Sequence, residues 1–273
     1  MNAPSLFSLE GKKIAFSGAT GVLGKTMALH LASVGAELLL IGRTPEKVTE
    51  LVGEVTAAGG KAFAYIADVT DEESLDKVAK EIEVQHGHVD VLINSAGGNM
   101  PGAVVRPDQN FLDLDTQALR KVMDLNYLGT VLPIKALLPL MLKQGKGNIL
   151  NISSMAASRP MTRVMGYASA KAAIDNLTKW LSVELAQKHG PEFRVNAIAP
   201  GFFLTEQNRT LLTETDGSLT QRGNQIIGHT PMGRFGKPED LLGALQWLCS
   251  DASAFVTGTI VPVDGGFSAY SGV

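Results

Sequence analysis

The sequence predicts a doubly wound α/β fold, a three-layer sandwich around a single parallel sheet of about seven strands. Three observations predict it: short apolar runs recur along the 273 residues, amphipathic helical segments separate them, and no linker-like stretch divides the chain. Strands that are apolar throughout are typical of a parallel sheet whose two faces are both covered. Right-handed crossovers would then distribute the helices over both faces.

Seven apolar runs supply the predicted strands. They read KIAFSG (13–18), ELLLIGR (37–43), KAFAYIADV (61–69), VDVLINSAG (89–97), GNILNISS (147–154), RVNAIAPG (194–201) and TIVPVDGG (259–266). Helical spacing is clearest in two segments between them. One face of 23–34 carries Leu23, Met27, Leu31 and Val34, and one face of 74–85 carries Leu75, Val78, Ala79 and Ile82.

We expect a single domain over 1–273 with two irregular excursions. Residues 98–115 follow the fourth predicted strand, and 202–235 follow the sixth. Both begin at the carboxyl end of a strand, where open α/β sheets bind ligands. The second excursion is too long for an ordinary connection, so we interpret it as a substrate lid.

Composition excludes several classes of function. The net charge of −3 offers no basic surplus for nucleic acid or an anionic membrane. One cysteine, Cys249, excludes an internal disulfide and fits a reducing compartment. The amino terminus does not resemble a signal peptide, and no stretch of about 20 apolar residues predicts a membrane span. We therefore expect a cytoplasmic protein. The five histidines form no ligand cluster, so we also expect no metal.

The first strand runs into a glycine-rich turn, SGATGVLGKT (17–26). A phosphate-binding P-loop needs four residues between its first glycine and the Gly-Lys pair, whereas five separate Gly18 from Gly24. The fingerprint G-x-G-x-x-G fails as well, because position 20 is Thr. A strand, a tight turn and a helix still aim backbone N–H groups at a pyrophosphate. We therefore favour a dinucleotide turn and expect Lys25 and Thr26 at an exposed helix start.

The end of the second strand bears on which dinucleotide binds. An acidic residue here accepts a hydrogen bond from the 2′-hydroxyl of NAD, whereas an arginine accommodates the 2′-phosphate of NADP. The sequence has Gly42 and Arg43, with no carboxylate before Glu46. NADP(H) is favoured, and NAD(H) stays open.

The segment 148–173 carries the strongest catalytic pattern. Tyr167 and Lys171 are four residues apart, so they share one face of a helix. An ammonium beside a phenol favours the phenolate and is expected to lower the tyrosine pKa towards neutrality. Ser154, thirteen residues before Tyr167, could hold a substrate oxygen against the phenol.

Taken together, the motifs resemble those of the short-chain dehydrogenase/reductase family over nearly the whole chain. The matching stretches are SGATGVLG (17–24), DV (68–69), NSAG (94–97), Asn126, Ser154, YASAK (167–171) and PGFFLT (200–205). Two positions depart from the family pattern, Val22 for a glycine and Ser95 for an asparagine. The resemblance implies a Rossmann-type fold and a ketone–alcohol oxidoreductase that uses NAD(P).

The resemblance also implies roles for residues. Tyr167 is the general acid/base, Lys171 assists it and binds the nicotinamide ribose, Ser154 polarises the carbonyl, and Asn126 holds a relay water. The predicted cofactor contacts are Gly18, Thr20, Gly21, Val22, Leu23, Arg43, Asp68, Val69, Asn94, Ala96, Gly97, Tyr167, Lys171, Pro200, Gly201 and Thr205.

A narrower resemblance concerns the substrate. The stretches INSAGGN, NISSM, IAPGFFLTEQNRTLL, TPMGRFG and PVDGGFSAYSGV are similar to those of family members acting on sugar acids, the D-mannonate oxidoreductases (fructuronate reductases), with gluconate 5-dehydrogenases as close alternatives. A carboxylate substrate favours an arginine fork. The candidate substrate residues are Asn99, Arg159, Arg163, Gln207 and Arg209.

Two further alternatives and one conflict stay open at this point. Fructuronate reduction is usually associated with NADH, which does not fit the pattern at Gly42-Arg43. A 3-oxoacyl carrier-protein reductase is an alternative enzyme. A non-catalytic NAD(P)-binding regulator is an alternative from another class of protein. The small-molecule substrate is the expected partner, and family resemblance implies a homotetramer.

Overall fold

A computed structural model describes residues 3–205 and 208–272 of the chain. Its centre is a seven-stranded sheet in the order β3-β2-β1-β4-β5-β6-β7, with every pair of neighbours parallel. The strands are β1 (Lys13–Ser17), β2 (Glu37–Gly42), β3 (Lys61–Ile66), β4 (Val91–Asn94), β5 (Gly147–Ile152), β6 (Phe193–Pro200) and β7 (Ile260–Val263). Each lies within the run that predicts it, except that β6 begins one residue earlier, at Phe193, and the predicted fold class is confirmed.

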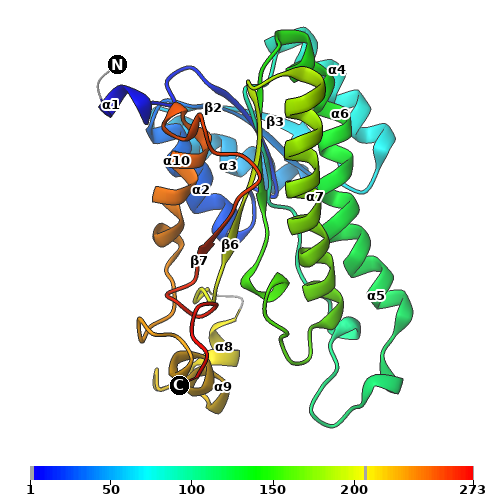
Figure 1. The fold of residues 1–273 in the computed structure, drawn as a ribbon, viewed down its shortest axis with the longest axis vertical. Helices are drawn as coiled ribbons and strands as arrows, with labels where there is room; N and C mark the ends of the chain where they lie inside the picture. Colours follow the sequence, from blue (N-terminus) through cyan, green and yellow to red (C-terminus); the bar gives the residue numbers. More distant parts are fainter. Residues whose placement is uncertain (1–2, 206–207, 273) are drawn as a thin grey trace.

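Helices cover both faces of the sheet (Figure 1). One layer holds α2 (Val22–Ser33), α3 (Pro45–Ala57) and α10 (Leu242–Cys249), whose buried side chains form one core with the strands. The other holds α4 (Glu72–His86), α6 (Gly129–Gln144) and α7 (Met165–His189), which contribute to a second core. The short α1 (Ala3–Leu6) lies near the amino terminus. The predicted three-layer arrangement follows from these two cores.

Helix α4 shows how local sequence sets an element. Asp71 accepts hydrogen bonds from the N–H groups of Glu73 and Ser74, which would otherwise lack partners at the helix start. Gly87, with φ of 78°, ends the helix in a conformation that glycine adopts without steric cost. The four buried residues of α4 are those that the spacing predicts.

A continuous helical run joins α5 (Thr116–Met123), a π-helical turn (Asp124–Leu128) and α6. By length and composition alone the run 116–144 is apolar enough to cross a membrane, with a mean hydropathy of 1.4 in its most apolar window. Core helices of soluble proteins satisfy the same criterion, and α6 packs against α4, β4 and β5. The π-turn turns Asn126 fully inward.

Both irregular excursions stand at the carboxyl edge of the sheet, at the bottom of Figure 1. The first contains two short turns, Pro101–Ala103 and Phe111–Asp113. The second contains α8 (Arg209–Leu212) and α9 (Gln221–Gly228). Its two ends are tied together, since Gly236 N donates to the Phe202 carbonyl at 2.8 Å and Leu204 N donates to the Gly236 carbonyl at 3.0 Å. Closure of this segment over a substrate stays a prediction.

Candidate active site

The glycine turn after β1 is shaped by close backbone contacts. Gly18 has φ of 79°, and a Cβ on it would lie 2.4 Å from the Ala96 nitrogen. A Cβ on Gly24 would lie 2.3 Å from the Gly18 carbonyl oxygen. Neither position can accept a side chain, so β1, α2 and the loop after β4 meet at a backbone cradle.

Val22 replaces a family glycine without straining this cradle. It is the first residue of α2, after the N-cap Gly21, and among the described non-glycine residues only Arg163 has a positive φ. Position 22 therefore requires none of glycine's conformational freedom. Lys25 points elsewhere, with its Nζ 2.6 Å from Glu54 Oε1 on α3. It is exposed as predicted, whereas Thr26 is half-buried.

Two adjoining hollows form a cleft along the carboxyl edge of the sheet. The first lies over the ends of β1 to β4, and the second continues over β5 and β6. The predicted cofactor residues that line the cleft are Gly18, Thr20, Gly21, Val22, Leu23, Arg43, Asp68, Val69, Ala96, Gly97, Tyr167, Lys171, Pro200, Gly201 and Thr205.

The far end of the first hollow is cationic. Arg43 and Lys47 both line it, together with Thr44. Asp68 lies opposite, where hydrogen bonds from the Thr70 hydroxyl and N–H, at 2.7 and 2.9 Å, lower its pKa, helped by the charge of Arg43. Sequence reasoning missed Lys47, although its place one turn after Arg43, at the start of α3, was an available signal.

Asn94 does not line the cleft, contrary to prediction. It is the last residue of β4, and its buried side chain lies on the α7 side of the sheet, where Nδ2 donates to Asn151 Oδ1 at 3.0 Å. Asn151 in turn donates to Thr178 Oγ1 on α7 at 2.9 Å. Side chains alternate along a strand, so the next residue, Ser95, faces the cleft instead.

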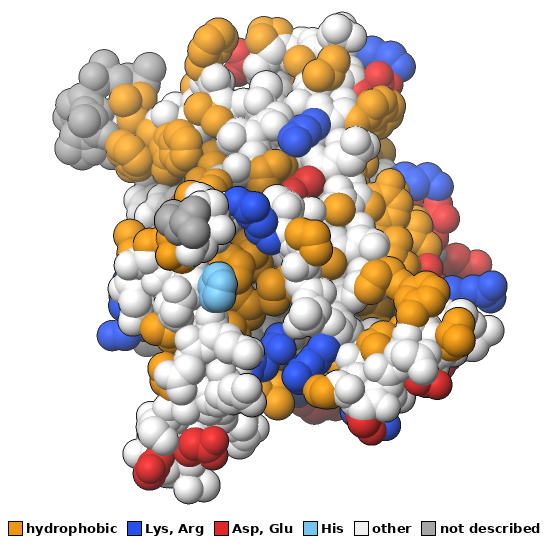
Figure 2. All heavy atoms as spheres, turned by 60° about the horizontal axis from the view of Figure 1, so that its bottom comes forward, with side chains coloured by type: hydrophobic (Ala, Val, Ile, Leu, Met, Phe, Trp, Pro, Cys, Tyr) orange, Lys and Arg blue, Asp and Glu red, His pale blue; other side chains and the backbone are white. Residues whose placement is uncertain are grey.

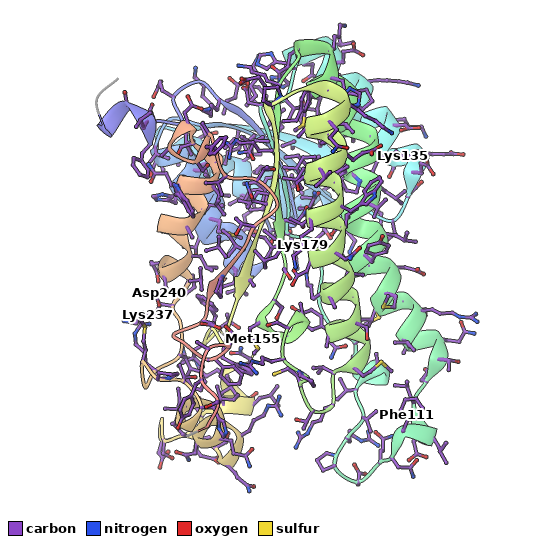
Figure 3. The ribbon with its side chains drawn as sticks, in the orientation of Figure 1. Phe111, Lys135, Met155, Lys179, Lys237 and Asp240 are labelled. Atoms are coloured by element: carbon purple, nitrogen blue, oxygen red, sulfur yellow. The ribbon has the colours of Figure 1, made fainter. Side chains whose placement is uncertain are left out.

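The second hollow brings together Ser154, Tyr167 and Lys171. Ser154 follows β5 and caps the short turn 155–157 by accepting from Ala156 N at 3.2 Å. Met155, labelled in Figure 3, is buried beside it and anchors the turn. Tyr167 and Lys171 lie in the first two turns of α7, which packs against this turn.

The electrostatics differ from prediction in one respect. Burial raises the pKa of Tyr167 above its usual value, and the hydrogen bond with Ser154 opposes that shift. The expectation that Lys171 lowers this pKa below normal is wrong for the protein alone. Lys171 Nζ lies 5.6 Å from the Tyr167 ring centre and donates to the Ile152 carbonyl at 2.7 Å. Burial also lowers the Lys171 pKa to about 8.

Asn126 lies behind the cleft wall and does not line either hollow. Its Nδ2 donates to the carbonyls of Gly98, at 2.7 Å, and Val122, at 2.8 Å. A Cβ on Gly97 would lie 2.6 Å from Asn126 Oδ1 and 3.3 Å from Lys171 Nζ. The absence of a side chain at Gly97 thus allows the asparagine and the lysine to approach the same point.

Of the predicted substrate residues, the four that the structure describes, Asn99, Arg159, Arg163 and Arg209, do not line these two hollows. Arg159 Nε donates to the Ser268 carbonyl at 2.9 Å, and Asn99 Oδ1 accepts from Met100 N at 2.9 Å. Arg209 is exposed on α8, and Gln207 lies outside the described residues.

Arg163 has a different neighbour. Its carbonyl accepts from Val105 N at 3.0 Å, which joins its loop to the first excursion. Burial and the nearby charge of Arg163 lower the pKa of Arg222 on α9. Sequence reasoning missed Arg222, because only folding brings α9 to this loop. Figure 2, with this end turned to the viewer, shows Lys and Arg side chains gathered in the middle of the face.

No group of three or more His, Cys, Asp or Glu residues that could hold a metal ion occurs in the described part of the chain. Cys249 is buried, and burial raises the pKa of its thiol to about 12. The glycine cradle, the cleft and the Ser-Tyr-Lys group instead define a dinucleotide-dependent oxidoreductase.

Comparison with known proteins identifies the family. The family described as enoyl-(acyl carrier protein) reductase matches residues 18–268. The uncharacterized oxidoreductase UxuB of Bacillus subtilis (strain 168) is 47% identical over 275 residues, which cover 97% of this chain and 98% of that protein. The gluconate 5-dehydrogenase of Gluconobacter oxydans (strain 621H) is 33% identical over 268 residues, covering 98% and 99%.

Solved structures agree with this assignment. A proposed D-mannonate oxidoreductase from Haemophilus influenza, with bound NAD, superposes with a TM-score of 0.91 at 45% identity, and each chain is covered completely. A gluconate 5-dehydrogenase from Burkholderia cenocepacia J2315, in complex with NADP and tartrate, gives 0.86 at 29% identity, covering 98% of this chain and 100% of that one. The chain belongs to the short-chain dehydrogenase/reductase family and is an NAD(P)-dependent oxidoreductase acting on alcohols and ketones.

Proposed function

We propose that the protein interconverts a ketone and a secondary alcohol on a sugar acid, D-fructuronate and D-mannonate, with Tyr167 as general acid/base. The observation that carries the chemistry is the meeting of Ser154, Tyr167 and Lys171 in one hollow that adjoins the glycine cradle. A non-catalytic regulator would not need this complete set.

The cleft fits a nicotinamide dinucleotide, because Gly18, Gly21 and Gly97 line both hollows and add no side chains to the wall between them. The N-terminus of α2 would face the phosphates, Asp68 and Val69 the adenine, and Thr205 the carboxamide. When bound, this cofactor supplies or accepts the hydride.

The protein's own residues handle the substrate oxygen and the proton. Ser154 donates a hydrogen bond from its hydroxyl to the substrate oxygen and orients that oxygen towards Tyr167. In reduction, Tyr167 gives its phenolic proton to that oxygen, and in oxidation it takes the proton back. The Lys171 ammonium stabilises the phenolate electrostatically. Asn126 Oδ1, which accepts from Gly98 N at 3.1 Å, has a second lone pair to hold the relay water.

We propose a preference for NADP(H). Arg43 and Lys47 supply two positive charges at the end of the cleft where a 2′-phosphate would lie, and no carboxylate lines that end except Asp68. The NAD in the related Haemophilus structure favours the alternative. Direct measurement with both cofactors decides between them.

An acidic substrate is supported by the pair Arg163 and Arg222. Neither lines the two hollows and, among the described residues, neither forms an ion pair with a carboxylate, so an anion bound beside them would relieve their mutual repulsion. The sugar acids in the printed names of related structures supply the substrate class.

A substrate panel with NADPH and NADH tests this function. D-fructuronate should be reduced, with 5-keto-D-gluconate and a 3-oxoacyl carrier-protein thioester as the two enzyme alternatives. Failure of both sugar acids with both cofactors would refute the sugar-acid proposal. Cofactor binding without turnover of any carbonyl compound would favour the regulator.

We also propose a cytoplasmic homotetramer that binds neither nucleic acid nor membrane. Trp180 and Val183 leave 57% and 54% of their surface exposed on α7, as expected for a helix that pairs with another subunit. The single buried thiol of Cys249 suits a reducing compartment. Light scattering should give four times the mass of 28.9 kDa, and a monomer would contradict the assembly.

A further inference from the structure

A carboxylate lies one helical turn beyond the catalytic lysine. Asp175 follows Lys171 by four residues on α7, so both side chains project from the same face of the helix. Ser153, at the end of β5, donates a hydrogen bond from its hydroxyl to Asp175 Oδ1. Asp175 lines neither hollow of the cleft, and the mechanism above does not use it.

Lys171 needs such a neighbour because it is buried. Only 4% of its surface is exposed, and its one hydrogen-bond partner among the described residues is the uncharged Ile152 carbonyl. Burial without an opposing charge favours the neutral amine. Burial lowers the Lys171 pKa to about 8, and the negative charge of Asp175 opposes the fall.

A hydrogen bond from Ser153 holds the Asp175 carboxylate in place. Burial raises its pKa, whereas the Ser153 hydrogen bond and then the charges of Lys179 and Lys171 lower it. The Ser153 backbone is fixed in turn, since its N–H donates to the Ile198 carbonyl of β6 at 2.8 Å. The carboxylate, which α7 carries, is therefore also tied to the sheet through Ser153.

Elements packed against α7 offer no substitute for this charge. The π-turn carries Asp124 and Tyr127, and β6 carries Arg194, but none of them contributes to the pKa shift of Lys171 or Asp175. The same holds for Arg120 and Lys121 of α5. Within the described chain, Asp175 is the carboxylate that acts on Lys171.

We propose that Asp175 is a positioning residue: its carboxylate, fixed to the end of β5 by Ser153, keeps Lys171 charged beside Tyr167. The inference rests on the proposed function, in which the ammonium stabilises the phenolate. Ser153 and Ser154 then have separate tasks, since the first holds the carboxylate behind Lys171 and the second faces the substrate.

The test is the titration of Lys171 itself, which needs no substrate. In protein carrying ¹³C-labelled lysine, its side-chain resonance is identified by its loss in Lys171→Arg. Asp175→Asn should lower the Lys171 pKa by about one unit, and an unchanged titration would overturn the proposal. Because this titration does not depend on turnover, its result can be distinguished from a failure of the proposed function.

A kinetic readout separates positioning from simple destabilisation. With D-fructuronate, Asp175→Asn should shift the alkaline fall of kcat/KM to lower pH by the same amount. The loss should lie in kcat, with KM little changed, because Asp175 does not contact the substrate. A uniform loss at every pH would indicate structural damage and contradict the proposal.

Three further variants complete the design. Asp175→Glu should restore much of the Lys171 titration, and Ser153→Ala should shift it in the same direction as Asp175→Asn but by less. Asp124→Asn, which removes an exposed carboxylate of the π-turn packed against α7, is the matched control and should leave the titration within about 0.2 units. If Asp175→Asn does not fold, Ser153→Ala decides, and an unshifted Lys171 in that folded variant overturns the proposal.

Discussion

Asn126 and Gly98 exchange two hydrogen bonds: Gly98 N donates to Asn126 Oδ1 at 3.1 Å, and Asn126 Nδ2 donates to the Gly98 carbonyl at 2.7 Å. The side-chain amide thus pairs with the backbone beyond the end of β4, as a neighbouring strand would. Nδ2 also donates to the Val122 carbonyl of α5. The π-turn is thereby joined to the cleft wall beside Lys171.

Asn126→Ala should loosen this connection between the π-turn and the cleft wall. The substitution removes two hydrogen bonds to the half-buried backbone of Gly98, each worth about 0.5–1.5 kcal/mol of unfolding free energy. We expect urea unfolding to show that loss of stability, and we expect kcat to fall as well. Asn224→Ala, at an exposed asparagine of α9, is the control for stability. Equal stability of Asn126→Ala and the parent would contradict the pairing as a stabilising contact.

Tyr167→Phe keeps the ring and removes the acid/base. It should reduce kcat by about 10²–10⁴-fold while the melting temperature and cofactor affinity hold. Since burial raises the Tyr167 pKa, the phenol predominates at neutral pH, so the rate of alcohol oxidation should rise with pH in the alkaline range. Unchanged turnover in the variant would remove Tyr167 from the mechanism.

The sheet was predictable because its signal is local. Each strand is an apolar run, and the buried faces of α2 and α4 follow from spacing alone. The position of the cleft was partly predictable in the same way, since a strand end and a helix start fix where Gly18 and Arg43 lie.

Contacts between distant segments were not predictable. Asp175 lies four residues after Lys171, yet its link to Ser153 exists only because β5 packs beside α7. The placement of Asn94 failed for a related reason, because the direction of a side chain at a strand end depends on where the strand stops. Arg222 meets the Arg163 loop only through the folded second excursion.

Arg43→Ala should weaken NADPH binding selectively. Loss of one charge-assisted contact to a phosphate costs about 1.5–3 kcal/mol, equivalent to a rise in Kd of about tenfold or more, whereas NADH affinity should change little. The matched control is Lys25→Ala, because Lys25 pairs with Glu54 outside the two hollows. Titration by cofactor fluorescence measures both constants. Equal losses for NADPH and NADH would contradict a 2′-phosphate site at Arg43.

Arg222→Gln tests the anion site at the lid. Removal of the guanidinium should raise KM for D-fructuronate about tenfold, the cost of one charged hydrogen bond, without affecting a neutral ketone. Arg106→Gln removes an exposed arginine of the first excursion, which pairs with Asp108 at 3.5 Å, and serves as control. A similar rise in KM for charged and neutral substrates would assign Arg222 to lid structure instead.

Asp240 predicts a pH dependence of stability at the exit of the lid. Figure 3 shows Lys237 and Asp240 where this chain leads into α10. Arg234 NH1 and NH2 donate to the Asp240 carboxylate at 2.6 and 3.0 Å, and Lys237 N donates at 2.8 Å, which lowers the Asp240 pKa to about 2.

The folded-state pKa of Asp240 lies below its unfolded value of 3.8, so its stabilisation is complete above about pH 4 and is lost as pH falls towards 2. Because the carboxylate is exposed, solvent screening limits the effect to about 0.5–1 kcal/mol. Asp240→Asn should therefore reduce the unfolding free energy by that amount at pH 7 and 5, and by less at pH 3, in urea titrations. Asp108→Asn, in the exposed pair with Arg106, should show no such difference. A deficit for Asp240→Asn that stays constant down to pH 3 or below would contradict the depressed pKa as its cause.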